Sequence, residues 1–183
     1  MLALPKNIRV ALGHYHFLRE TKKKHTERST VSFDHATKIG VLYDATDEHE
    51  FEVVKNYVKH VRGNFRKDIF ALGFVDRKVL PSSQYAQFGL DFFTRKSLDY
   101  KMVPKDIVVT NFIDEKYDIL INLASSRCFP LRYIAALSNA KFRVGRFDKK
   151  DIHCYDMMVE IKGEPPVKTV IEEMETCLRQ IRN

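Results

Sequence analysis

Two short polar segments carry the side chains best suited to bind a ligand. Asp44 and Thr46 follow one apolar run, and Ser125, Ser126 and Arg127 follow another. Hydroxyls and a guanidinium beside the free N–H groups at the start of a helix are suited to bind an anion. That anion could be a nucleotide-like molecule or a sugar phosphate. The alternative for the serines is ordinary helix-start chemistry, because serine is a common N-cap.

Asp44 and Asp47 are the one acid pair expected near a strand end. Two such carboxylates could share a proton or bind a cation. The alternative is that Asp47 caps a helix, since Asp47 followed by Glu50 fits a capping box. The sequence contains no GxSxG, GxGxxG or GxxxxGK[ST] motif. It therefore predicts no specific catalytic residue. Whether the protein is an enzyme is left open by the sequence, which favours a non-catalytic protein.

Metal and thiol chemistry find little support in the sequence. The three cysteines, Cys128, Cys154 and Cys177, form no CxxC pair, so we interpret them as reduced thiols. His14 and His16 differ by two positions and would point to different sides of a helix. We therefore expect no metal site and no cofactor.

The positive charge of the chain is concentrated at its start. The formal net charge is +7, and residues 1–38 hold eight Lys and Arg against three acidic residues. Such a cluster can bind phosphates or an acidic partner, including RNA. The alternative is a solvated C-terminal end of a helix, where basic residues interact favourably with the helix dipole. The dense part of this basic patch is Arg19, Lys22, Lys23, Lys24 and Arg28.

The basic patch ends a helix predicted over residues 6–24. Ile8, Leu12, Tyr15 and Leu18 form one apolar stripe along it. We expect this helix to dock on the rest of the protein through that stripe, leaving the lysines exposed. If it does not dock in this way, the stripe is a surface for a partner. Residues 25–37 show no helical stripe and are predicted to be a linker.

Strand and helix patterns alternate through the remainder. Predicted strands cover 38–44, 68–75, 90–94, 118–124, 142–146 and 156–161, and predicted helices cover 47–63, 107–115, 130–138 and 167–181. Alternation of this kind indicates an α/β fold: a single Rossmann-like or flavodoxin-like layered domain with a mostly parallel sheet. We divide the chain into a basic N-terminal helix and linker (1–37) and this domain (38–183). Ligands of such sheets bind beyond the carboxyl ends of the strands, which is where both polar segments fall.

The start of the chain, MLALPKNIRV, has too short an apolar run for a secretory signal, and no run approaches the length of a membrane helix. We therefore expect a cytoplasmic protein without a membrane partner.

The segment YDILINLASSRCFPLRYIAALSNAKFRVGRF, with the start KIGVLYDATDEHEF and the chain length, resembles an uncharacterised family of Bacteroidota, a conserved domain of unknown function. That resemblance covers most of the chain and implies no activity. Residues 118–123 and 140–145 more weakly resemble the N-terminal half of heptosyltransferase-type glycosyltransferases. This second likeness implies a Rossmann-like half-domain without the half that holds the donor sugar nucleotide, and no catalytic residue is carried over.

These observations favour a non-catalytic binding or adaptor module with an unidentified protein partner. Two alternatives remain. One is an RNA- or ribosome-associated protein that uses the basic N-terminal arm. The other is a small enzyme or sensor that binds an anionic ligand near Ser125–Arg127.

Overall fold

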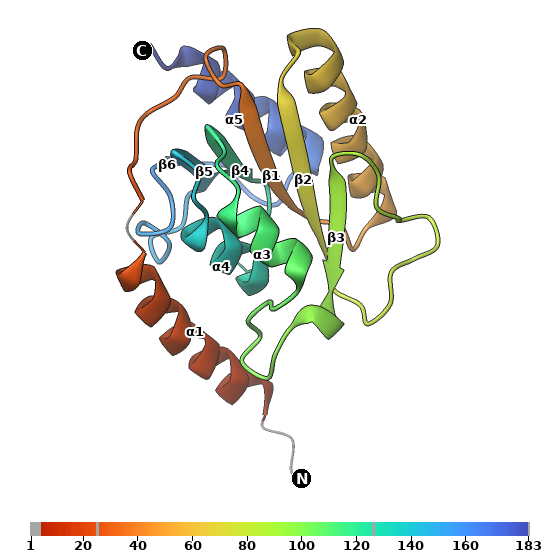
Figure 1. Cartoon of the computed structure of the whole chain (residues 1–183), viewed down its shortest axis with the longest axis vertical. Coiled ribbons are helices and arrows are strands. Elements are labelled where there is room, and N and C mark those ends of the chain that lie inside the picture. Colours follow the sequence, from red (N-terminus) through yellow and green to blue (C-terminus); the bar gives the residue numbers. More distant parts are fainter. Residues whose placement is uncertain (1–4, 25, 126, 183) are drawn as a thin grey trace.

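The computed structural model describes residues 5–24, 26–125 and 127–182, in which strands and helices alternate as predicted (Figure 1). Within these ranges the strands are β1 (Lys38–Asp44), β2 (Asp68–Val75), β3 (Leu90–Thr94), β4 (Ile119–Asn122), β5 (Phe142–Arg146) and β6 (Met157–Val159). The helices are α1 (Lys6–Lys23), α2 (Glu48–Phe65), α3 (Ile107–Asp114), α4 (Phe129–Leu137) and α5 (Val167–Gln180), with one 3-10 turn, η1 (Arg95–Ser97).

The strands form one sheet in the order β3-β2-β1-β4-β5-β6, and every neighbouring pair is parallel. This confirms the single α/β layered domain with a parallel sheet. The order is the one found in Rossmann domains, and it reverses between β1 and β4. Because the connections leave β1 and β4 in opposite directions, the carboxyl ends of these two strands border a crevice.

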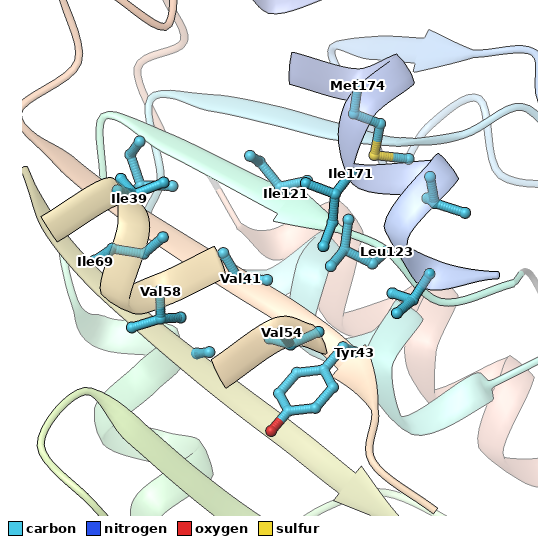
Figure 2. Packing of buried hydrophobic residues seen from close by; sticks show 14 of the residues in the cluster. Ile39, Val41, Tyr43, Val54, Val58, Ile69, Ile121, Leu123, Ile171 and Met174 are labelled. Carbon is cyan, nitrogen blue, oxygen red and sulfur yellow. The ribbon is translucent and has the colours of Figure 1, made fainter. Parts of the chain in front are cut away.

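One face of the sheet is covered by α2 and α5, and the other by α3 and α4 (Figure 1). Valines spaced four residues apart on α2 and apolar residues of α5 pack on the first face, as Figure 2 shows. The second face forms a separate buried cluster with α3 and α4. The strands between them are buried on both faces, which explains their nearly continuous apolar sequences.

The helix boundaries follow from local chemistry. Asp47 caps α2 by accepting hydrogen bonds from the backbone N–H groups of His49 and Glu50, as predicted. The predicted stop at Gly63 was wrong, because α2 continues to Phe65. The chain turns at Arg66, which adopts a left-handed conformation with φ 53°. A side chain at Gly63 would meet open space, so nothing there forces the helix to end.

The first helix docks on the domain, but the predicted docking face was wrong. Phe17 is fully buried, in contact with the rings of Phe129 and Tyr133 on α4. Gly13, one turn earlier, lies against the backbone of Lys101. The face that carries Gly13 and Phe17 therefore contacts the domain, and the stripe that contains Tyr15 faces outward.

The linker was predicted over residues 25–37, and within it residues 26–37 lie against the domain without helix or strand, with a turn at residues 33–35. Phe33 is fully buried in the larger cluster, and the Arg179 guanidinium lies 4.2 Å from the centre of its ring. The backbone N–H of Ser29 donates to the Lys141 carbonyl at 3.1 Å. These contacts fix the path of residues 26–37.

Asp118 joins three segments at the amino edge of the sheet. Its carboxylate accepts hydrogen bonds from the N–H and hydroxyl of Thr37, from the N–H of Lys38 and from the Lys141 ammonium, at 2.7–3.0 Å. Burial alone would raise the pKa of this carboxyl. The hydrogen bonds from Lys141 and Thr37 outweigh burial and hold the pKa well below its usual range.

We expect Asp118→Asn to lower the free energy of unfolding by about 2 kcal/mol at neutral pH, because an amide cannot accept all four bonds. A group whose pKa is lowered by folding stabilises the protein above its unfolded pKa, near 4, and loses that effect as the pH falls. The difference between wild type and variant should therefore be constant from pH 8 to 5 and shrink in more acidic solution. Urea unfolding at several pH values measures it, with Asp114→Asn, at an exposed position on α3, as the control. Equal effects of the two substitutions would contradict this role for Asp118.

Candidate functional site

The crevice between the carboxyl ends of β1 and β4 holds a cavity of 240 Å³. Its walls come from the ends of β1 and β5, the segment between β4 and α4, the first turn of α2, the loop before α5 and the first turn of α5. The lining residues are Asp44, Glu50, Leu123, Ala124, Ser125, Cys128, Arg146, Glu164, Pro165, Val167 and Val170.

The structure brings only part of the predicted ligand-binding set into this crevice. Asp44 and Ser125 line the cavity. Thr46 has a structural contact instead: its hydroxyl accepts a hydrogen bond from the Asp76 N–H at 2.9 Å, which ties the end of β1 to the end of β2. Arg127 is exposed and forms a 3.0 Å ion pair with Glu164. Ser126 lies outside the described residues.

The charges in the crevice do not favour an anion. Three of its lining residues, Asp44, Glu50 and Glu164, are acidic, against the single guanidinium of Arg146. Burial raises the pKa of Glu50, with the nearby carboxylates adding to that effect. Asp44 also accepts the Thr46 N–H at 2.9 Å, in a turn that shapes the start of the β1–α2 connection. A phosphate in this cavity would therefore meet more negative than positive charge.

Among the described residues that line the crevice, Cys128 supplies a thiol. Burial raises the pKa of this thiol to about 12. A thiol is nucleophilic as its thiolate, which at neutral pH would be a minute fraction of this group. The side chain therefore packs at the start of α4 without being activated for covalent chemistry.

The structure separates the predicted basic patch into two groups. Arg19 and Lys22 are exposed on the outer side of α1, and Lys23 pairs with Glu20 at 3.0 Å. Lys24 and Arg28 instead line a second cavity, of 460 Å³, beneath the end of α1. This arm cavity is lined by Thr21, Lys24, Thr26, Glu27, Arg28, Ala136, Arg143 and His153.

The side of α1 that faces away from the domain combines exposed apolar and basic side chains. Tyr15 is 71% exposed, Ile8 43% and Leu12 39%, and Leu18 is also exposed beside them. Helical periodicity places Lys22 in line with Ile8 and Tyr15, with Arg19 alongside. We refer to Ile8, Leu12, Tyr15, Leu18, Arg19 and Lys22 together as the outer face.

Sequence reasoning missed Arg143 and His153, which approach the arm cavity from β5 and from the loop after it. Arg143 is only 8% exposed and forms two hydrogen bonds to Asp156 through its Nε and Nη2 atoms. One signal was present: an arginine inside a short apolar strand needs a partner for its charge. Nothing in the spacing related Arg143 to Lys24 or Arg28.

Two kinds of feature are absent from the described part of the chain. No group of three or more His, Cys, Asp or Glu side chains is placed to hold a metal ion there. No helix there is both long and apolar enough to cross a membrane.

Comparison with known proteins agrees with the resemblance of the sequence to a domain without an assigned activity. Residues 11–181 match the model of a family of unknown function (DUF6913), and the chain belongs to that family. No curated protein and no solved structure matches the chain.

Proposed function

We propose that this protein is a non-catalytic binding module that docks an acidic, amphipathic segment of a partner protein along the outer face of α1. The observation that supports this most directly is an anchored helix that turns its apolar stripe toward solvent. Phe17 and Gly13 hold α1 on the domain, so Tyr15 and Leu12 are exposed even though the helix is docked.

The composition of the outer face favours a protein partner of defined charge. Its first three turns expose isoleucine, leucine and tyrosine, and its last two expose Arg19 and Lys22. Tyrosine is enriched among the residues that contribute most to protein–protein binding. Glu20, on the same helix, pairs with Lys23 at 3.0 Å and also attracts Arg19. This one carboxylate is outnumbered by the basic groups of Arg19, Lys22 and Lys23. A helix with an apolar stripe and an acidic end would be complementary in both respects.

The side chains that could perform chemistry at the strand ends have structural roles or are not activated, which favours binding over catalysis. Asp47 caps α2, and the thiol of Cys128 is held protonated by burial. Thr46 holds two strand ends together.

Site-specific photo-crosslinking tests this proposal. A photoreactive amino acid at position 15 should give a cross-linked product with a second protein, and one at the exposed loop position 79 should not. The protein identified at position 15 is then purified and titrated with the full chain. We expect Tyr15→Asp to weaken its binding by at least about tenfold, while Val79→Asp leaves it unchanged. Because both positions are exposed, neither variant should lower the melting temperature.

The proposal also predicts the charge dependence of this binding. Lys22→Glu should weaken the interaction, and increasing salt should weaken the wild-type interaction. Cross-linking of position 15 only to another copy of this chain would contradict the proposal. Equal binding by the Tyr15→Asp and Val79→Asp variants would contradict it as well.

A further inference from the structure

We propose that the arm cavity is a binding site for the phosphate group of a small phosphorylated molecule. The site lies beneath the end of α1, apart from the outer face, and does not depend on the function proposed above. It is built from segments distant in the sequence: the end of α1, residues 26–28, the last turn of α4, β5 and the β5–β6 loop.

Positive charge converges on this cavity without equal compensation. Lys24, Arg28 and Arg143 line it, and neither Lys24 nor Arg28 forms an ion pair with a described residue. Asp156 pairs with Arg143 at an N–O distance of 3.1 Å and also attracts Arg28, so the three basic residues face two carboxylates, those of Asp156 and Glu27. Glu27 is the acidic residue among the lining side chains, and it is exposed to solvent, where its charge is screened.

Arg28 is the central group. Its guanidinium donates hydrogen bonds to the carbonyls of Ala140 and Ser138, which orient it at the end of α4. Burial, followed by the charge of Arg143, lowers its pKa to about 10. A partly buried guanidinium has lost part of its hydration, and a bound anion would compensate for that loss. Two guanidiniums and an ammonium are the groups that proteins use to hold phosphate.

Hydrogen-bonding capacity in the cavity fits the same ligand. The Thr26 hydroxyl is buried and has no partner among the described residues. Rotation of the Thr26 side chain would turn its hydroxyl into the cavity, where it could donate to a phosphate oxygen and satisfy a group that is otherwise unpaired. The volume of 460 Å³ lies within the range of small-molecule sites.

Titration of the full chain with inorganic phosphate and with glycerol 3-phosphate, at constant ionic strength, tests the site. Calorimetry should show saturable binding of both. Lys24→Met should weaken it by about tenfold, because a charged hydrogen-bonding group is removed without leaving a buried partner. Thr26→Val should also weaken it without lowering the melting temperature. Lys59→Met, at an exposed position of α2, should leave it unchanged.

A second arm of the experiment separates small phosphates from nucleic acid. A fluorescent single-stranded RNA is added with and without excess glycerol 3-phosphate. RNA binding that the small phosphate does not displace, and that Lys24→Met and Lys59→Met weaken equally, would overturn the cavity as the site. Absence of saturable phosphate binding would overturn it too, as would equal phosphate affinity of the Lys24→Met and Lys59→Met variants.

Discussion

Replacing Gly13 with alanine is expected to destabilise the protein, although the same replacement in most helices is stabilising. Alanine is favoured over glycine inside a helix by about 1 kcal/mol. At Gly13, however, a Cβ atom would overlap the carbonyl oxygen of Lys101 and crowd the ring of Phe129. Because the obstacle is backbone, rotation of a side chain cannot relieve it. Overpacking of this kind typically costs about 1–3 kcal/mol.

Gly63 provides the matched control for this prediction. It lies near the end of α2, and a Cβ atom there would meet no other atom within 4 Å. Gly63→Ala should therefore raise the free energy of unfolding by up to about 1 kcal/mol. Denaturant unfolding measures both variants, and hydrogen exchange should show loss of protection confined to α1 in Gly13→Ala. A Gly13→Ala variant as stable as wild type would show that α1 does not approach Lys101 closely.

The result bears on the proposed function because the outer face depends on a docked helix. If α1 lifts from the domain, Phe17 becomes exposed beside Tyr15, and the surface loses its defined shape. The Gly13→Ala variant should then bind a partner of the outer face less selectively than wild type.

The docking face of α1 shows why hydrophobic periodicity alone was insufficient. Ile8, Leu12 and Tyr15 form a stripe that is typical of a buried face, yet they are exposed. The buried face is defined instead by Phe17 and by the absence of a side chain at Gly13, which permits close backbone contact. A count of apolar residues gives glycine no weight, so close packing through glycine escapes it.

The sheet was predictable because its strands are short, apolar and bounded by polar residues. β1 and β2 have the predicted limits. β4 and β6 are shorter than expected. Leu123 and Ala124 are buried beyond the last residue of β4, so their apolar character reflects burial in the core and not strand length. The strand order could not be derived from the sequence, since alternating strands and helices fit several orders.

A candidate site could be predicted from the sequence only where its residues come from one continuous segment. Ser125 follows β4 and lines the crevice, as the pattern of strand and helix indicated. The arm cavity instead combines Lys24 and Arg28 with Arg143, more than a hundred residues later. No spacing rule relates positions so far apart, and only the path of residues 26–37 over the domain brings them together.

Arg132→Met is expected to have the largest effect on stability of any change considered, about 3–5 kcal/mol at neutral pH. Asp151 is 2% exposed, and the Arg132 guanidinium donates a 2.9 Å hydrogen bond to its carboxylate. Methionine would keep much of the packing over the rings of Phe17 and Phe129, where the guanidinium now lies. It would leave the buried carboxylate without its counter-ion, and the second replacement Asp151→Asn should restore most of the lost stability.

The pH dependence distinguishes the unpaired charge from lost packing. Burial raises the pKa of Asp151 even in the presence of Arg132, and removal of Arg132 should raise it further. A carboxyl whose pKa is raised by folding destabilises the native state above that pKa, and the effect disappears as the pH falls and the group takes up a proton. The deficit of Arg132→Met relative to wild type should therefore be largest near neutral pH and shrink in acid. In the double variant, which has no carboxyl at position 151, the deficit should lose this pH dependence. A deficit that is the same at every pH in both variants would assign the effect to the contacts of Arg132 with the aromatic rings instead.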